Sequence, residues 1–470
     1  MKSYVVLGGG ISGLSAAWKL SRNNRANVTL IERSDRVGGW MRSERTEHGS
    51  VFELGPRSLR TAGTQGKQTL NLITEIGLDS QVLPASKAAK TRFIWTDNHK
   101  LIPVPSSLKD TLKTVPPLTK PLLRTVLKEP ITKRQLLDDE SVYDFFCRRF
   151  GNEVADYFVD PLCRGIYAGK AKHLSIKSCF SQLFELEQKY GSVILGGVAG
   201  SVQGLLQPQA GPISTLSKRA KQQRWSIYTL QNGLQSLPDV LHQKLSDQAT
   251  IVTNTSCTKL IFTDNGTVKV HTDKNVLEAD HVVSAVPSKV LASLLDDDYS
   301  QLQQLLCTIP SVTTIVVNFE YKDEVLPPTY RSAFGYLVPS HQSPKILGVV
   351  FDSSVFPEQN GDAKTRLTVM MGGAWYEELF STSTTASDIE QVALDAIRHS
   401  LGINQDPTMC HVSVHKDSIP QYNVGFSKTL ESIHQYISTN SLPITLVGSS
   451  YRGVSVNDCV HNTMLAVSQL

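Results

Sequence analysis

A short apolar run near the start of the chain is the clearest element that the pattern of hydrophobic positions predicts. Tyr4-Val5-Val6-Leu7 is uniformly apolar and rich in valine, which is typical of a buried strand in a parallel sheet. The glycines that follow it mark a tight turn, and a helix is expected from about Ile11. A second apolar run, Val28-Thr29-Leu30-Ile31, predicts the next strand. The chain is therefore expected to begin with a strand, a helix and a second strand.

The turn between that strand and that helix has the spacing of a dinucleotide-binding loop. Gly8 permits the turn, Gly10 lets a pyrophosphate approach the backbone, and Gly13 lets the helix lie close to the strand. Glu32 ends the second strand, where it is placed to accept hydrogen bonds from an adenosine ribose. Glycine-rich turns alone have many structural uses, so the prediction depends on strand, helix and acid occurring in register.

A second glycine pair follows this acid. Arg36-Val37-Gly38-Gly39 comes shortly after Glu32, and its two glycines again permit close approach of the backbone. This extension resembles flavin-binding proteins of the amine oxidase superfamily rather than nicotinamide dehydrogenases. A glycine turn without a ligand is the alternative interpretation.

Near the C-terminus, residues 444–459 predict another strand, glycine turn and helix. The stretch contains Gly448 and Gly453 and resembles the second flavin motif, in which backbone amides at a helix start face the flavin. Strands between the two motifs are expected at 250–252, 257–262, 267–272 and 281–283. The last of these strands ends in a turn that contains Ala285.

The central part of the chain changes character. Residues 87–134 contain eleven Lys or Arg and three Asp or Glu, a net charge of +8, interleaved with aliphatic and aromatic residues. This mixture suits a peripheral surface on anionic lipid, and amphipathic helices with a solvated basic face are the alternative. Helical spacing returns from Asp138, residues 161–169 are expected to interrupt it as a loop, and residues 190–216 are interpreted as a buried helix plus a loop.

A β-rich half follows from Thr313 to about His415, with strands expected at 313–321, 332–337, 346–351 and 366–371 and a helix at 388–401. The fold class is therefore predicted as mixed α/β with three domains. They are a Rossmann-like FAD-binding domain (1–85, 222–292 and 430–470), a mostly helical, basic, membrane-associating domain (86–210) and a β-rich substrate-binding domain (293–429).

Composition adds mainly exclusions. The 470 residues are 40% hydrophobic and 19% charged, which describes an ordinary globular protein, and the net charge of +4 is too small to imply nucleic acid. The seven cysteines are scattered, odd in number and without a CxxC pair, which argues against a disulfide framework and a zinc site. A first strand at the N-terminus leaves no room for a cleaved presequence, so any organelle targeting is expected to be internal.

Several longer motifs carry a more specific resemblance. They are Gly38-Gly39-Trp40, Phe52-Glu53-Leu54-Gly55-Pro56-Arg57, Leu162-Cys163-Arg164-Gly165, Phe334-Gly335-Tyr336-Leu337-Val338-Pro339, Ile419-Pro420-Gln421-Tyr422 and Val456-Asn457-Asp458-Cys459. With these motifs the chain resembles, from end to end, the oxygen-dependent protoporphyrinogen oxidases of animal mitochondria.

This resemblance implies one noncovalent FAD per chain and the oxidation of protoporphyrinogen IX to protoporphyrin IX in haem biosynthesis. O2 would be the acceptor and hydrogen peroxide the by-product. The resemblance also implies a homodimer attached peripherally to an anionic membrane surface, the intermembrane-space face of the mitochondrial inner membrane, with ferrochelatase as a candidate partner.

The resemblance also implies which residues form the site. The substrate is a broad apolar disc with two propionates on one edge, so its site needs apolar walls and a cation. By resemblance Arg92 is that cation, Phe334, Leu337 and Met370 are wall residues, and Gly165 offers close backbone approach, with core packing as the alternative for the apolar three. The expected cofactor-binding residues are Gly8, Gly9, Gly10, Ile11, Ser12, Gly13, Glu32, Arg33, Arg36, Gly38, Gly39, Trp40, Gly55, Pro56, Arg57, Cys257, Ala285, Gly448, Gly453, Val454, Val456 and Asn457. No side chain is expected to act as catalyst or to bind metal, because the flavin carries the chemistry.

Two other functions remain as alternatives. An amine or polyamine oxidase has the same fold, but those enzymes usually carry Arg at the position of Trp40, and this chain has no cysteine for a covalent flavin link at Gly448-Ser449-Ser450-Tyr451. The Rab GDP-dissociation inhibitors share the architecture without flavin, and Glu32 together with both glycine motifs argues against that class.

Overall fold

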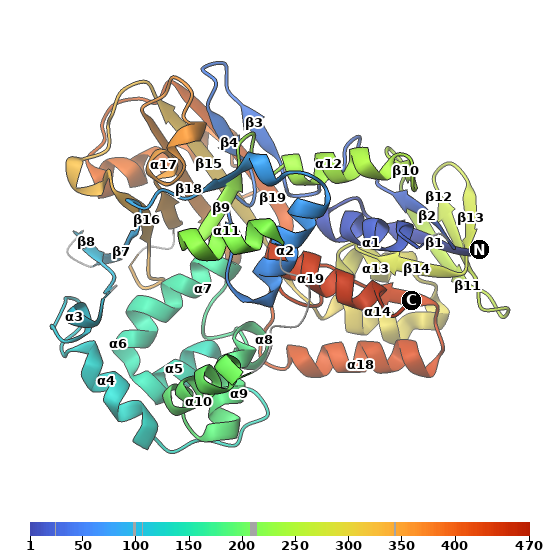
Figure 1. Ribbon diagram of the computed structural model, residues 1–470, viewed down its shortest axis with the longest axis horizontal. Coiled ribbons are helices and arrows are strands. Elements are labelled where there is room, and N and C mark those ends of the chain that lie inside the picture. Colours follow the sequence, from blue (N-terminus) through green and yellow to red (C-terminus); the bar gives the residue numbers. More distant parts are fainter. Residues whose placement is uncertain (24, 97–99, 106, 207–213, 343–344) are drawn as a thin grey trace. The chain divides into compact units, whose positions relative to one another are not determined.

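The contacts along the chain group it into two units, each with a hydrophobic core of its own. The computed structural model (Figure 1) describes residues 1–470 apart from residues 24, 97–99, 106, 207–213 and 343–344. Unit 1 consists of Met1–Ala85, Ile213–Pro310 and Lys428–Leu470, and unit 2 consists of Ser86–Pro212 and Ser311–Ser427. The basic segment and the β-rich half thus share a unit, and their division into two functional domains stays a prediction. The boundary expected at residue 210 lies outside the described residues.

A five-stranded parallel sheet forms the centre of unit 1. Its order is β10-β2-β1-β14-β20, made by Thr250–Val252, Ala26–Ile31, Lys2–Leu7, His281–Ser284 and Ile444–Leu446. The N-terminal apolar run lies in the middle because both faces of the central strand are covered, and Val6 is fully buried. The sheet therefore joins strands from the beginning, the middle and the end of the chain.

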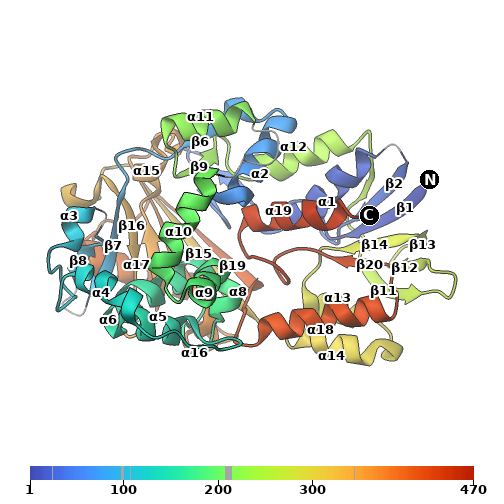
Figure 2. The same ribbon diagram turned by 60° about the horizontal axis from the view of Figure 1, so that its bottom comes forward.

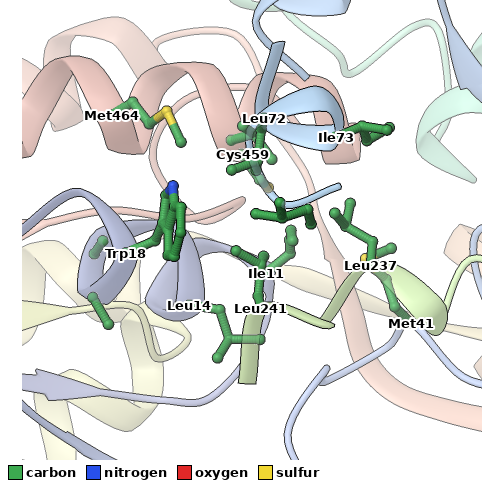
Figure 3. Close-up of a cluster of buried hydrophobic side chains, with 14 of the residues drawn as sticks. Ile11, Leu14, Trp18, Met41, Leu72, Ile73, Leu237, Leu241, Cys459 and Met464 are labelled. Carbon is green, nitrogen blue, oxygen red and sulfur yellow. The ribbon is translucent and has the colours of Figure 1, made fainter. Parts of the chain in front are cut away.

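Helices from both ends of the chain pack against this sheet. In both views α1 (Ile11–Ser21) and α19 (Val456–Val467) lie side by side (Figures 1 and 2). Figure 3 shows Trp18 of α1 and Met464 of α19 in one buried cluster with Leu72 of α2 (Gly63–Glu75). The remaining elements of unit 1 are β3 (Ser43–Arg45), β4 (Val51–Glu53), β5 (Leu59–Arg60), β6 (Val82–Pro84), β9 (Ile227–Leu230), β11 (Cys257–Phe262), β12 (Val268–Thr272), β13 (Val276–Ala279), α11 (Thr215–Gln223), α12 (Ser236–Leu245), α13 (Ser288–Leu294), α14 (Ser300–Cys307) and most of α18 (Phe426–Thr439).

Unit 2 is built on a seven-stranded sheet of order β19-β15-β18-β17-β16-β7-β8. The strands are Met409–Pro420, Ser311–Tyr321, Thr365–Gly372, Ile346–Val350, Ala333–Leu337, Thr91–Thr96 and Lys100–Pro103. All neighbours are antiparallel except β16 and β7, which are parallel. One face carries buried residues such as Phe93, Tyr336 and Val369, and these pack against α17 (Ala386–Leu401). The opposite face is left for other contacts.

The other helices of unit 2 are α3 (Leu108–Thr111), α4 (Leu122–Lys128), α5 (Val142–Phe150), α6 (Asn152–Val154), α7 (Asp160–Tyr167), α8 (Ile176–Cys179), α9 (Ser181–Tyr190), α10 (Val193–Leu206), α15 (Asp352–Val355) and α16 (Tyr376–Leu379). Of these helices, α8, α9 and α10 lie together (Figure 2). In the described part of the chain, every helix is too short or too polar to cross a bilayer.

Two local expectations are wrong, and one pair of strands was not predicted. Residues 161–169 do not form a loop: Pro161 stands in the first α-helical turn after the π-helical turn Ala155–Val159, and α7 continues from it to Tyr167. Within the segment expected to consist of short helices or loops, Thr91–Thr96 and Lys100–Pro103 form β7 and β8. The helix expected to be buried within 190–216 is half exposed, since Leu195 and Val198 of α10 keep 52% and 62% of their surface. An apolar helix composition indicates burial or a contact surface equally well.

A buried ion cluster joins the helices of unit 2. Arg149 of α5 pairs with Glu129, and both side chains are fully buried. Arg149 also lies 3.3 Å from Glu187 of α9. The second oxygen of Glu129 accepts hydrogen bonds from Ser192 and from Ile194 N (3.2 Å) at the start of α10. One carboxylate thus fixes the start of α10 to α5 and α9.

We expect Arg149→Met to destabilise the protein by about 3–5 kcal/mol, because the change leaves Glu129 buried without its counter-charge. The measurement is the midpoint of urea unfolding. Arg398→Met is the matched control, since Arg398 belongs to the same unit but pairs with Asp395 and Asp406 at the surface, where such pairs contribute about 0.2–1 kcal/mol. Equal shifts for both variants would contradict a stabilising role of the buried cluster.

Candidate active site

Two of the three glycines in the turn between β1 and α1 are required by the conformation and contacts of the protein itself. Gly8 has a φ of +96°, which side chains rarely adopt, and its N–H donates to Ile31 O at 2.8 Å. A Cβ on Gly13 would overlap the Gly8 carbonyl oxygen, so α1 can lie this close to β1 only because residue 13 is glycine. A Cβ on Gly10, by contrast, would meet nothing within 4 Å. The open space at Gly10 therefore fits a ligand at the start of α1.

Glu32 holds the same turn from the second strand. Its Oε2 accepts a hydrogen bond from Gly9 N at 2.6 Å, and its Oε1 accepts from the N–H (2.8 Å) and hydroxyl (2.7 Å) of Ser34. The main chain of Thr255 and Asn254 also bonds to Glu32 O and Ser34 O. Glu32 is therefore a structural clamp of the loop, and its bond to a ribose stays a prediction.

The second glycine pair lies directly against the first turn. Gly38 N donates to Gly9 O at 2.8 Å, and a Cβ on Gly39 would lie 3.3 Å from Gly10 Cα. Arg36 donates to the carbonyls of Gly39 (2.7 Å) and Met41 (3.3 Å). Burial, and secondarily the charge of Arg42, lower the pKa of Arg36. In the structure Arg36 thus binds its own loop and fixes the shape of the glycine pair.

The motif at residues 52–57 also depends on a glycine for close main-chain contact. A Cβ on Gly55 would overlap the carbonyl oxygen of Trp40, so these two segments touch through their main chains. The Trp40 side chain is 44% exposed, whereas Pro56 and Arg57 are partly buried. Glu53, which the sequence placed in this motif without a role of its own, is a buried carboxylate that accepts hydrogen bonds from Ser43 Oγ (2.6 Å) and Leu234 N (2.7 Å).

The C-terminal motif meets the first turn at the carboxyl edge of the parallel sheet. Gly448 has a φ of +102°, and a Cβ there would lie 3.6 Å from Ser12 Oγ and 3.7 Å from Ala285 O. These three residues follow β20, β1 and β14, whose carboxyl ends share one edge of the sheet. The predicted convergence of the two glycine motifs is therefore present in the structure.

The start of α19 completes this edge. Ser455 caps the helix by accepting from Asp458 N, and Val456 is the first residue of α19. Asn457 is buried and donates to Arg60 O at 2.8 Å, while its Oδ1 has no hydrogen-bond partner among the described residues. Gly453 has a φ of +73°, and Val454, which follows it, is partly buried. A buried acceptor without a partner and amides at two helix starts suit a polar ligand such as a flavin dinucleotide.

The last expected cofactor residues lie further along the loop. Ile11 and Ser12 are buried in the first turn of α1, whereas Arg33 is exposed. Cys257 begins β11, two residues after Thr255, which bonds to Glu32 O at 3.0 Å. Burial raises the pKa of the Cys257 thiol to about 11, and a bond with the Lys259 main chain opposes the rise. The thiol is therefore protonated at neutral pH, in accord with a main-chain role at this position.

In unit 2 the expected substrate residues gather on the face of the sheet that α17 does not cover. Leu337, Gly348 and Met370 are cross-strand neighbours. A Cβ on Gly165 of α7 would lie 2.9 Å from Leu337 Cδ2. We call Gly165, Phe334, Leu337 and Met370 the apolar wall; its three side chains are only partly buried, unlike the core residues of the opposite face.

Arg92 lies beside this wall. It pairs with Gly335 across β7 and β16, and its Cζ lies 4.9 Å from the centre of the Phe334 ring. The register between these strands is irregular at Ala333 and Gly335, and Gly335 has a φ of +144°. A guanidinium over an aromatic face keeps its positive charge, and a planar carboxylate is a favoured partner of such a cation.

The comparisons with known proteins identify the family of the chain. The sequence model of the family described as flavin containing amine oxidoreductase matches residues 11–470. The protoporphyrinogen oxidase of Bos taurus is 42% identical over 477 residues, which covers 100% of this chain and 98% of the bovine protein. That of Schizosaccharomyces pombe is 31% identical over 495 residues and covers 98% of this chain and 96% of the yeast protein.

Among solved structures, one from Exiguobacterium sp. 255-15 matches with a TM-score of 0.79 at 23% identity, covering 100% of this chain and 98% of that one. Identity at this level shows the fold alone, whereas the full-length matches to the bovine and yeast proteins show the family. The chain therefore belongs to the flavin containing amine oxidoreductases and, among them, to the protoporphyrinogen oxidase family.

Proposed function

We propose that this chain binds one FAD noncovalently and oxidises protoporphyrinogen IX to protoporphyrin IX, the penultimate step of haem biosynthesis. The observation that carries the proposal is the 42% identity over the whole chain to the bovine protoporphyrinogen oxidase. In balance, the substrate gives up six electrons and six protons, so three O2 become three hydrogen peroxide. The same full-length identity favours this substrate over an amine or polyamine.

The glycine turns of unit 1 suit the cofactor. Amides at the starts of α1 and α19 can bind phosphate oxygens, and the open space at Gly10 admits them to the backbone. Bound FAD would supply an acceptor for two electrons at a time. The chain's own residues contribute shape, because Glu32 and Arg36 hold the two turns open through the bonds described above.

The apolar wall and Arg92 suit the substrate. Leu337, Met370 and the Phe334 ring offer apolar surface to a broad macrocycle, and Arg92 places a positive charge beside that surface for one propionate. Holding the disc in one orientation is the main catalytic task of the protein, since correct placement of the reacting atoms removes much of the barrier. We assign no side chain as general acid or base.

The cofactor assignment predicts that Gly10→Val yields folded protein without flavin. Valine at this position meets no protein atom within 4 Å of its Cβ but occupies the space assigned to the pyrophosphate. The measurements are flavin absorbance per chain and the circular dichroism spectrum. Gly13→Ala is the matched control, because its Cβ overlaps the Gly8 carbonyl and should impair folding itself. Full flavin content in Gly10→Val would show that the pyrophosphate lies elsewhere.

The substrate assignment predicts that Arg92→Ala lowers kcat/KM for protoporphyrinogen IX by roughly tenfold to a hundredfold, because a charge-assisted hydrogen bond contributes about 1.5–3 kcal/mol. Arg92→Lys should recover only part of the loss, since an ammonium lacks the planar fork. Flavin content and thermal midpoint should stay unchanged. Arg331→Ala, an exposed arginine of the same unit, should leave kcat/KM as it is; unchanged kinetics in Arg92→Ala would exclude it as the propionate anchor.

We further propose peripheral attachment to an anionic membrane through residues 87–134. Among the exposed apolar side chains of this segment are Leu112 (59%), Leu127 (67%) and Ile131 (83%), and Leu136 (75%) follows it. Arg134 donates to Gln188 O at 2.9 Å, and the Gln188 amide donates to Gln135 O at 3.1 Å, so this segment lies on α9. The half-exposed α10 starts from the same ion cluster. Apolar side chains among cations are typical of an interfacial surface.

Attachment of this kind is sensitive to charge, since each cation near an anionic surface contributes about 1 kcal/mol and salt screens it. Cosedimentation with cardiolipin-containing vesicles should fall when Lys109, Lys113, Lys120 and Arg124 are changed to Ser. As a control of equal charge, changing Lys244, Lys269, Lys274 and Lys289 of unit 1 should leave it unchanged. Equal binding by both variants would favour solvated basic helices instead.

The wider cellular setting follows from the resemblance and stays a prediction. It comprises a homodimer, the intermembrane-space face of the mitochondrial inner membrane and transfer of the product to ferrochelatase. Retention of the protein by isolated inner membranes, and its release by salt, would test the attachment in that setting.

A further inference from the structure

A wide helical turn precedes the part of α7 that carries Gly165. Residues 152–167 form one continuous helix, in which Ala155–Val159 has π-helical hydrogen bonding. Pro161 follows at once and cannot donate the N–H that a regular helix needs. Turns of this type are rare and occur mostly at functional sites, where they redirect a helix face. Here the turn lies immediately before Arg164 and Gly165.

Arg164 ties this helix to the hairpin of β16 and β17. Its side chain is fully buried, with Nη1 donating to Val338 O at 2.6 Å and Nη2 donating to Ile346 O at 3.1 Å. Both carbonyls lie at the connection between the two strands. The guanidinium Cζ also lies 4.4 Å from the centre of the Trp375 ring. One side chain thus fixes three segments of unit 2 to each other.

Burial lowers the pKa of Arg164 to about 10, and Asp160 opposes that shift. The guanidinium is therefore still charged at neutral pH, and the carbonyl dipoles and the ring face beside it favour the charged form. Asp160 itself accepts from Ser340 N (2.6 Å) and Ser340 Oγ (3.0 Å), which adds a second link between α7 and the same hairpin.

Gly165 of α7 leaves no room for a side chain beside Leu337. Leu337 Cδ2 lies 2.9 Å from the position of a Cβ on Gly165, the residue after Arg164. A change in the distance between α7 and the hairpin of β16 and β17 would therefore change the rotamer or the position of Leu337. Met370 lies in the same cross-strand row, two strands away.

We infer that Arg164 is a positioning residue for the apolar wall: by linking α7 to the Val338 and Ile346 carbonyls it sets where Leu337 stands, and so how the macrocycle is held. This inference rests on the proposed function, because the wall matters only if a tetrapyrrole binds there. Lysine cannot replace this arginine, since a single ammonium does not bridge two carbonyls and stack on an indole at once.

Arg366 provides a matched comparison within the same unit. It is also a buried arginine that donates to main-chain carbonyls, with Nη2 3.0 Å from Phe356 O, and its Nε donates to Asn360 Oδ1 at 2.9 Å. None of these partners belongs to the apolar wall. Changes at Arg366 and Arg164 should therefore cost similar stability but differ in their effect on porphyrin binding.

The experiment compares Arg164→Lys and Arg366→Lys as FAD-loaded proteins. For Arg164→Lys we expect the Kd for protoporphyrin IX, measured by its absorption shift, to rise about tenfold. The KM for protoporphyrinogen IX should also rise about tenfold. Flavin content and the rate at which O2 reoxidises the reduced protein should stay at the wild-type values. For Arg366→Lys we expect a lowered thermal midpoint with porphyrin affinity within about twofold of wild type.

A second variant keeps the test decisive if Arg164→Lys does not fold. Gly165→Ala retains the buried arginine but pushes Leu337, so it should also weaken porphyrin binding, and Leu337→Val should restore part of the affinity in the double variant. Wild-type affinity in Arg164→Lys or in Gly165→Ala, or equal losses in Arg164→Lys and Arg366→Lys, overturns the inference. Wild-type protein that binds no protoporphyrin IX would instead overturn the proposed function.

Discussion

The close approach of α1 to β1 is the constraint on which unit 1 depends. Helix and strand touch where a Cβ on Gly13 would overlap the Gly8 carbonyl oxygen, and no side chain can stand between them. This contact brings the start of α1 to the carboxyl edge of the sheet, next to Gly38 and Gly448. A surface made of backbone amides rather than side chains results, which is the kind of surface that phosphates require.

In unit 2, buried arginines have a comparable organising role but two different energetic consequences. Arg149 pairs with the buried carboxylate of Glu129, so removal of either partner leaves an uncompensated charge. Arg164 donates to main-chain carbonyls and stacks on Trp375 instead. Carbonyl partners contribute stability as well, because loss of the arginine leaves buried acceptors unsatisfied. The ion cluster therefore contributes stability, whereas Arg164 contributes stability and also sets the shape of the wall.

The predicted elements differ in how well they match the structure, for identifiable reasons. The strands at 250–252 and 257–262 and the helix at 388–401 agree closely with β10, β11 and α17, since alternation and helical spacing are local properties. Residues 161–169 were mistaken for a loop, and the strand Thr91–Thr96 was not predicted, because the conformation of both depends on distant partners. Pro161 is compatible with a helix start or a loop, and 91–96 become a strand through pairing with β16.

The sequence by itself determined the two glycine motifs and the positions of several main strands along the chain, and through the resemblance it predicted roles for Arg92 and the wall residues. These features are readable because a glycine required by close approach, and an apolar run, are visible without knowledge of their partners. Only the tertiary structure decided that Glu32 and Arg36 bind their own loops and that Glu53 of unit 1 and Arg164 of unit 2 are buried and hydrogen-bonded. The sequence does not distinguish a buried arginine from a solvated one. The role of a buried arginine is set by carbonyls and rings that folding brings to it from far along the sequence.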